Sequence, residues 1–268
     1  MRYKLMLIDC DRTLLTDQGV VTERTKNAIR NAVQNGVKVV FASGRALSGI
    51  EKIIKVIGTD DLFDYFICFN GGMIVCSNNK QVVSESILTT DDTIRIASNI
   101  CCSPEDYYIF TSNRLICQGD NEQATIEAMK NDMSVTRGDI SQLNDEEKIY
   151  KMVFAGKKEK LDKIEQIIPE TLRKQYNVTR SEPNNLEFMS LNASKGHALI
   201  TLTDILNIRI QETICFGDAE NDMSMLKMAG TGVAMGNANE KLKAIADRIT
   251  DSNNNDGLAK AIEELVLS

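Results

Sequence analysis

Both ends of the chain repeat one pattern, in which a short continuous apolar run is followed by a polar loop and then by an amphipathic segment. Residues 5–8 form such a run, and residues 37–42 and 213–216 are mainly apolar segments that we also expect to be buried strands. Runs of this kind are typical of strands that are buried on both faces of a parallel sheet. Strands that alternate with helices favour right-handed crossovers, so the pattern predicts a doubly wound, mostly parallel α/β sheet. The expected helices include residues 47–57, 197–206, 222–229 and 258–267, the last one capped by Asp256.

The pattern changes near residue 82. The strands expected beyond it alternate polar and apolar residues, which indicates an α+β layer with one sheet face covered and the other open to solvent. We therefore predict two domains, a Rossmann-like core made of residues 1–82 and 186–268, and an inserted α+β cap made of residues 83–185. Within the insertion we expect strands at 83–87, 107–112, 114–118, 151–155 and 176–180, and helices at 91–101, 122–132 and 157–172; a further strand is expected just after it, at 186–189.

The charge and histidine content limit the chemistry that is available. The chain has 38 acidic and 31 basic residues, for a formal net charge of -7, and no dominant basic run. Non-specific nucleic-acid binding needs clustered cations, so we expect no nucleic-acid partner. The single histidine, His197, excludes a multi-histidine metal site within one chain. If the chain is an enzyme, its acid-base chemistry is expected to use carboxylates.

The location of the protein is inferred from segments that the sequence lacks. No stretch approaches the roughly 18–20 apolar residues of a membrane span. The first apolar segment is too short for a signal sequence. The seven cysteines are odd in number and have no CxxC spacing, which argues against a disulfide framework or a zinc site. We expect a reduced, cytoplasmic protein without a membrane partner, either a monomer or a homodimer.

The first strand ends in Asp9-Cys10-Asp11-Arg12-Thr13. The loop that follows a parallel strand lies at the carboxyl edge of the sheet, where open α/β folds bind ligands. Two carboxylates this close repel each other unless a cation lies beside them. An ordinary acidic turn would have the same sequence, so this string by itself leaves both interpretations open.

A second acidic loop, Gly217-Asp218-Ala219-Glu220-Asn221-Asp222, follows another buried strand. Acidic residues also occur at helix N-termini, where they complement the helix dipole. The two loops converge if their strands are neighbours in the sheet. Hard oxygen ligands without histidine or thiolate describe a Mg²⁺ site. Asp9, Asp11, Asp218 and Asp222 are therefore the candidate metal ligands.

Two further loops could bind a phosphate. Ser43 and Gly44 follow the second strand and offer a hydroxyl and exposed backbone N–H groups. Lys195 stands at the start of a predicted helix, where backbone donors and an ammonium can face an anion. The alternatives without a ligand are a simple serine-glycine turn and a solvated lysine.

The order of these motifs resembles the haloacid dehalogenase superfamily, and more narrowly its Cof-type phosphatases. The matching segments are DxDxT at 9–13, Ser-Gly-Arg at 43–45, Asn-Gly-Gly at 70–72, Lys-Gly at 195–196 and Gly-Asp-x-x-Asn-Asp at 217–222. The resemblance implies a cap of the C2 type, inserted between the second and third motifs. It also implies a Mg²⁺-dependent phosphatase acting on a small phosphorylated metabolite, either a sugar phosphate or a phosphorylated cofactor.

The resemblance also implies a role for each matching residue. Asp9 would be the nucleophile that forms an aspartyl-phosphate, and Asp11 the general acid and base. The metal would be held by Asp9, Asp218 and the backbone carbonyl of Asp11, with Asp222 in or just behind the ligand shell. The phosphate-binding residues would be Ser43, Gly44, Lys195 and Asn221, and Arg45 would orient the loops or the substrate.

One position departs from the family. The residue after the second aspartate is most often glycine there, whereas this chain has Arg12. If the position needs φ > 0, an arginine is strained; if it does not, the guanidinium lies near the phosphate and could change substrate preference. The alternatives to a phosphatase are a phosphotransferase or mutase of the same superfamily, a signalling module phosphorylated on aspartate, and a ligand-binding relative without catalysis.

Overall fold

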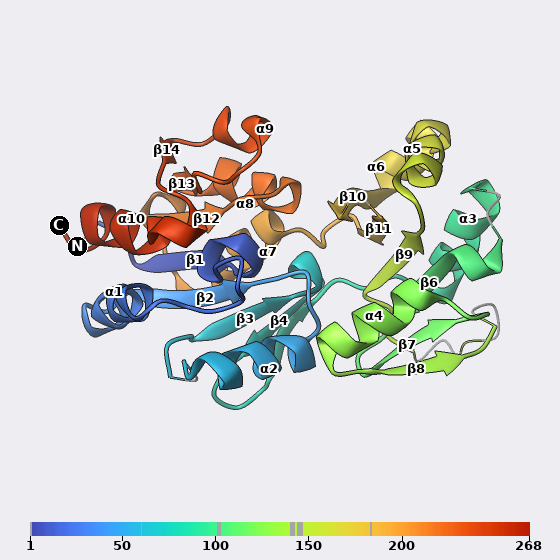
Figure 1. Ribbon diagram of the computed structural model, residues 1–268, viewed down its shortest axis with the longest axis horizontal. Coiled ribbons are helices and arrows are strands. Elements are labelled where there is room, and N and C mark those ends of the chain that lie inside the picture. The colour runs from blue at the N-terminus through green and yellow to red at the C-terminus, as the bar shows by residue number, and fades with distance from the viewer. Residues whose placement is uncertain (1, 60, 101–102, 140–142, 144–146, 183) are drawn as a thin grey trace.

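Two β-sheets, each packed against helices, make up the molecule (Figure 1). The computed structural model describes residues 2–59, 61–100, 103–139, 143, 147–182 and 184–268. No helix among these residues is long and apolar enough to cross a membrane.

The first sheet is built from both ends of the chain. Its strands are parallel from β14 to β3, and the β3–β4 hairpin and β5 add an antiparallel edge. The parallel part confirms the predicted doubly wound, Rossmann-like α/β fold. In spatial order the strands are β14 (Arg248–Ile249), β13 (Thr231–Ala234), β12 (Thr213–Gly217), β1 (Leu5–Asp9), β2 (Lys38–Ala42), β3 (Tyr65–Cys68), β4 (Met73–Cys76) and β5 (Val82–Glu85).

Helices cover both faces of the first sheet because side chains along each strand alternate between the faces. Met6 and Ile8 of β1 pack on one face in a cluster with α1 (Glu23–Gln34), α2 (Leu47–Ile57) and α10 (Gly257–Leu265). Leu5 and Leu7 pack on the opposite face in a cluster with α7 (Lys195–Leu206), α8 (Met223–Met228) and α9 (Glu240–Lys243).

The second sheet lies in the middle of the chain and is mostly antiparallel. Its order is β10 (Tyr176–Glu182), β11 (Asn185–Ser190), β9 (Lys151–Ala155), β6 (Tyr107–Phe110), β7 (Arg114–Cys117) and β8 (Ser134–Arg137). One face packs against α3 (Thr90–Ile100), α5 (Lys158–Ile167) and α6 (Glu170–Gln175). The expectation of an open second face is wrong, because α4 (Glu122–Asn131) packs on that face and the first domain lies beside it (Figure 1).

The two sheets suggest where the domains meet. β5 pairs with β4 and so belongs to the first sheet, although its half-exposed pattern, which is that of an edge strand, suggested the insertion. β11 pairs with β9 and β10 in the second sheet. We propose that the core comprises residues 1–85 and 191–268, close to the boundaries expected from the sequence.

Several local expectations need correction. The helix expected at 157–172 is two helices, because Pro169 and the residue before it are extended, as a residue preceding proline usually is. Asp256 is at the N-cap position of α10, as expected, but its φ is 56° and its carboxylate accepts a hydrogen bond from Thr22 and none from the helix. The short strands β8 and β14 were not expected. Residue 101, the last of the helix expected at 91–101, lies outside the described residues.

Candidate active site

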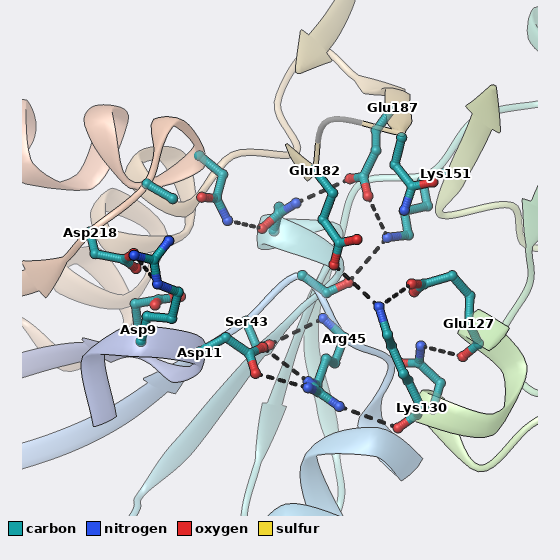
Figure 2. A pocket seen from close by; sticks show the side chains of 17 residues that line it. Asp9, Asp11, Ser43, Arg45, Glu127, Lys130, Lys151, Glu182, Glu187 and Asp218 are labelled. Atoms are coloured by element: carbon teal, nitrogen blue, oxygen red, sulfur yellow. Dashed lines mark hydrogen bonds and ion pairs between the residues drawn. The ribbon is translucent and has the colours of Figure 1, made fainter. Parts of the chain in front are cut away.

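A pocket of about 500 Å³ lies between the carboxyl edge of the first sheet and the inward face of the second (Figure 2). The register explains its position. β1 pairs in parallel with both β2 and β12, so the loops after these three strands meet at one edge, as the sequence predicted. The core residues that line the pocket are Asp9, Asp11, Arg12, Ser43, Gly44, Arg45, Asn70, Asp218, Ala219 and Asn221.

Three carboxylates converge at the wall of the pocket, where Asp9 and Asp218 line it and Asp222 lies behind them. Asp9, Asp218 and Asp222 each offer an oxygen within 4.8 Å of the others, and all three side chains are buried. The fourth candidate ligand, Asp11, has its carboxylate elsewhere: Arg45 Nε and Nη2 donate to its two oxygens at 3.2 and 2.9 Å. The three buried acids are therefore the side chains that could hold a cation.

The Lys-Gly motif at 195–196 places a lysine inside this acidic cluster. Lys195 is fully buried, and its ammonium donates to Asp9 at 2.5 Å and to Asp222 at 2.6 Å. The solvated lysine considered from the sequence is therefore wrong, because the start of α7 is buried against Ser224 of α8 and the turn at Gly71. One ammonium among three carboxylates leaves an excess of negative charge that a divalent cation would offset. The hard-oxygen donor set fits Mg²⁺.

The pKa values follow from burial and this excess charge. Burial, and then repulsion from Asp222, raises the pKa of Asp9 well above its ordinary value, against the opposing effect of Lys195. Burial and Asp222 also raise the pKa of Asp218 to about 6, although Arg12 lowers it in part. Burial would lower the pKa of Lys195, but Asp222 and Asp9 outweigh it and raise that pKa above its ordinary value.

Asp222 has both of its oxygens engaged by the protein. Oδ1 accepts from Lys195, while Oδ2 accepts from the backbone N–H groups of Asp218 and Ala219 at 3.0 and 3.1 Å. Gly217 allows this approach, because a Cβ there would lie 2.5 Å from the Cβ of Asp222. The Asp222 side chain thus fixes the loop that carries Asp218.

The predicted phosphate loop lies at the end of β2. Ser43 is buried, and its hydroxyl accepts from the backbone N–H of Arg45 at 3.2 Å. Asn221 donates to Asn70 at 3.0 Å, which connects the last motif to the Asn-Gly-Gly turn. The sequence motifs had included Asn70 only as part of a turn, yet it lines the pocket.

Arg12 has the positive φ that the sequence left open. Its φ is 64°, so the backbone is in the left-handed region, where a side chain other than glycine is strained. Asn237 donates to its carbonyl at 2.9 Å and holds the turn. The guanidinium lines the pocket and lies 3.9 Å from Asp218. Both properties considered from the sequence are therefore present: the Arg12 backbone is strained, and the Arg12 guanidinium lies near the acidic cluster.

The second domain supplies polar side chains that the sequence analysis did not find. Lys151 and Glu187 form a buried ion pair of 2.8 Å on the inward face of their strands. They also contact the core, since Lys151 donates to the carbonyl of Gly44 and Glu187 accepts from Asn70. A lysine beginning an apolar strand and a glutamate between Leu186 and Phe188 were the available signals. The full set is Glu127, Lys130, Asn131, Lys151, Glu182, Asn185 and Glu187 (Figure 2).

Other candidate side chains lie away from this chemistry. His197 is exposed on α7 and is not among the residues that line the pocket. Burial raises the pKa of the Cys10 thiol well above its ordinary value, which disfavours the thiolate. The described cysteines Cys10, Cys68, Cys76, Cys117 and Cys215 are free, and Cys101 and Cys102 lie outside the described residues.

The molecule thus combines a doubly wound core, which carries acids at its strand ends, with an α+β domain that faces them. Residues 6–262 match the family model of the haloacid dehalogenase-like hydrolases. The chain belongs to this family.

Known relatives match over nearly the whole chain. The protein YxeH of Bacillus subtilis (strain 168) is 34% identical over 99% of this chain and 99% of its own length. The 5-amino-6-(5-phospho-D-ribitylamino)uracil phosphatase YcsE of the same organism is 32% identical over 98% and 96%. A solved haloacid dehalogenase-like hydrolase from B. subtilis has 27% identity and a TM-score of 0.86, over 98% of this chain and 100% of that chain.

These findings confirm two predictions from the sequence. The superfamily resemblance, including its Cof-type branch, is confirmed by the family match and by the relatives. The chain is a phosphatase, as expected.

Proposed function

We propose that this protein is a Mg²⁺-dependent phosphatase that hydrolyses a small sugar phosphate through an aspartyl-phosphate on Asp9. The observation that carries the proposal is the arrangement at the sheet edge, where three buried carboxylates and one buried ammonium lie together at the wall of a polar pocket. The family relationship supports the reaction class.

Asp9 and Asp218 would hold the metal ion, together with the backbone carbonyl of Asp11. Asp222 would act behind them, since its oxygens already accept hydrogen bonds from Lys195 and from the backbone of the Asp218 loop. When bound, the ion would neutralise charge on the phosphoryl oxygens and on the acids. The main effect of replacing Asp222 would then be to displace Asp218, and the loss of a direct metal ligand would be the smaller effect.

In the first step, an Asp9 oxygen attacks phosphorus, the bond from phosphorus to the substrate oxygen breaks, and Asp11 gives that oxygen a proton. In the second step, Asp11 takes a proton from water, and the water oxygen attacks the phosphorus of the aspartyl-phosphate. Inorganic phosphate leaves and the Asp9 carboxylate is restored. Carboxylates act as the nucleophile, the acid and the base in this cycle, which agrees with the exposed position of His197.

Binding of the phosphoryl oxygens would use Ser43, the backbone at Gly44 and the ammonium of Lys195. Phosphoryl transfer depends mainly on positioned charge of this kind. Asn221 is held by Asn70 at the edge of the same pocket, so its amide is fixed in place for a substrate contact.

The lining of the pocket favours a sugar phosphate over a phosphorylated cofactor. Apart from Gly44 and Ala219, every described lining residue has a polar side chain, and none is aromatic. Binding sites for planar rings are usually apolar or aromatic. A hydroxyl-rich leaving group would match the carboxylates and ammonium groups that the second domain presents, and a volume of about 500 Å³ limits it to a small metabolite.

A panel assay of inorganic phosphate release tests the proposal. Sugar phosphates should give the highest kcat/KM, above flavin mononucleotide and pyridoxal phosphate, and EDTA should stop turnover until Mg²⁺ is restored. Phosphate that appears on a second metabolite instead of in water would indicate the phosphotransferase alternative. A preference for the ring-containing cofactors would contradict the assigned substrate class.

The cap residues provide a matched comparison. Lys130 lines the pocket, whereas Lys158 is an exposed lysine on α5 that pairs with Asp162. Lys130→Ala should reduce kcat/KM for the best sugar phosphate about tenfold or more, because one desolvated polar contact is worth about 1.4 kcal/mol or more. Lys158→Ala should leave it unchanged.

A further inference from the structure

The C-terminus of cap helix α4 is seated against the core by hydrogen bonds to its last carbonyl groups. Lys52 donates to the carbonyl of Met129 at 3.1 Å, Arg45 to that of Lys130 at 3.3 Å, and Ser48 to that of Asn131 at 2.5 Å. The last carbonyls of a helix lack partners within the helix, and cations are favoured there. Core side chains therefore supply the hydrogen-bond donors that the last carbonyl groups of α4 lack within the helix.

The contact is reciprocal at core helix α2. The residue at its N-cap is Ala46, whose side chain offers no acceptor. The Asn131 side chain supplies one instead, since its Oδ1 accepts from the Ala46 N–H at 2.7 Å. Asn131 is 1% exposed, so this bond is protected from water. Each domain thus provides hydrogen-bond partners for the end of a helix in the other domain.

Glycine at position 49 permits this close approach. A Cβ on Gly49 would lie 2.9 Å from Asn131 Oδ1 and 3.1 Å from its Cα. Gly49 is in the first turn of α2, where alanine would otherwise be the better helix former. The absence of a side chain here is therefore specific to the seating of α4.

The seated helix is connected to the site through one guanidinium. Arg45 donates to the Lys130 carbonyl with Nη1, while its Nε and Nη2 hold the two oxygens of Asp11 (Figure 2). A guanidinium is rigid and planar, so fixing one nitrogen fixes the direction of the other two. The position of the Asp11 carboxylate therefore depends on where α4 ends.

We propose that Asn131 is a positioning residue that couples the seating of the cap to the orientation of Asp11 through Arg45. The inference rests on the proposed function, in which Asp11 transfers the proton. When Asn131 caps α2, the Lys130 carbonyl is in place to hold Arg45, and Arg45 holds Asp11. When the cap lifts, Arg45 loses this anchor and Asp11 loses its fixed orientation. Proton transfer is thereby restricted to the closed enzyme.

Kinetics on p-nitrophenyl phosphate test the coupling. Asn131→Ala should lower kcat about ten- to a hundredfold with less than about a twofold change in KM, because misorientation affects proton transfer more than phosphate binding. Arg45→Ala should lower kcat as well, and the double variant should be no slower than Arg45→Ala alone. Multiplying effects, or a change confined to KM, would overturn the proposal.

Nuclear magnetic resonance of the substrate-free protein gives a readout that does not need turnover. In Asn131→Ala, hydrogen exchange should speed up at both the Ala46 amide and the Arg45 Nε–H. Unchanged exchange at Arg45 Nε–H would overturn the coupling whether or not the protein hydrolyses phosphate esters. If the wild type shows no turnover while both signals respond, the proposed function fails and the coupling of α4 to Arg45 stands.

Two further variants separate positioning from folding. Gly49→Ala should reproduce the kinetic defect by displacing α4, even though alanine favours the helix that contains it. Asn99 is the matched control: it donates to the Arg95 carbonyl four residues back, as Asn131 does to Glu127, but it is exposed on α3. Asn99→Ala should leave kcat, KM and both exchange rates unchanged. An equal loss in Asn99→Ala would contradict a specific role for Asn131.

Discussion

The ammonium of Lys195 lies 2.5 Å from a carboxylate oxygen of Asp9, although 186 residues separate the two in the sequence. The lysine is fully buried and also donates to Asp222. This contact joins the first strand of the chain to the helix that follows the inserted domain. It therefore completes the charge balance of the site only when both ends of the chain have folded together.

Lys195→Met should be strongly destabilising. Removing one partner of a buried ion pair leaves uncompensated charge, at a cost of about 3–5 kcal/mol. Urea denaturation in the presence of EDTA measures this as a fall in the free energy of unfolding. Lys227→Met, at an exposed position on α8, should change it by less than about 0.5 kcal/mol. A similar small change for Lys195 would show that the acids rearrange without it.

Metal binding should depend on Asp218 in a way that can be observed without substrate. Mg²⁺ should raise the melting temperature of the wild type, because a ligand that binds only the folded state stabilises it. Asp218→Asn should lose most of this rise. The exposed Asp204→Asn should keep all of it. A full Mg²⁺ response in Asp218→Asn would place the ion elsewhere.

Two replacements of Arg12 separate its backbone strain from its charge. Both Arg12→Gly and Arg12→Ala remove the guanidinium, but only glycine adopts a φ of 64° without steric strain. The freedom of glycine in the unfolded chain offsets part of a strain of about 1–2 kcal/mol, so Arg12→Gly should be more stable than Arg12→Ala by roughly 0.5–1 kcal/mol. A change in substrate preference shared by both variants would report the lost charge. Equal stability would show that the turn relaxes around alanine.

Acid sensitivity should depend in part on the Asp92–Tyr176 contact in the cap. Burial raises the pKa of Asp92, but hydrogen bonds from Tyr176 and Thr89 outweigh burial and lower this pKa below its ordinary value of 3.8. A lowered folded-state pKa means that the stabilisation is present above pH 3.8 and is lost as the pH falls through the folded value. Asp92→Asn should therefore lose less stability than the wild type between pH 5 and pH 3, measured as urea midpoints. The exposed Asp91→Asn should behave as the wild type; an unchanged acid loss in Asp92→Asn would contradict the contribution.

The core part of the site could be predicted because a parallel sheet constrains it. Once β1, β2 and β12 are recognised as buried parallel strands, their following loops must meet at one edge, which brings Asp9, Ser43 and Asp218 together. No knowledge of side-chain packing is needed for this step. The burial of Lys195 was not predictable in the same way, because nothing local distinguishes it from a solvated lysine at a helix start.

The cap part of the site could not be predicted. Whether Lys151 and Glu187 face the pocket depends on the pairing register of their strands and on which sheet face meets the core. The seating of α4 depends on Gly49 and Asn131, which are 82 residues apart and have no individual motif. Pro169, in contrast, was visible in the sequence and should have divided the helix expected at 157–172.

The most direct test of the account is to identify the phosphorylated residue during turnover. The enzyme is mixed with Mg²⁺ and a sugar phosphate that it hydrolyses, quenched in acid within its first turnovers, and digested for peptide mass analysis. The peptide that contains Asp9 should carry the mass of one phosphoryl group, and Asp9→Asn should remain folded, lack the modification and release no phosphate. A phosphoryl group on another residue, or undiminished turnover of Asp9→Asn, would contradict the account.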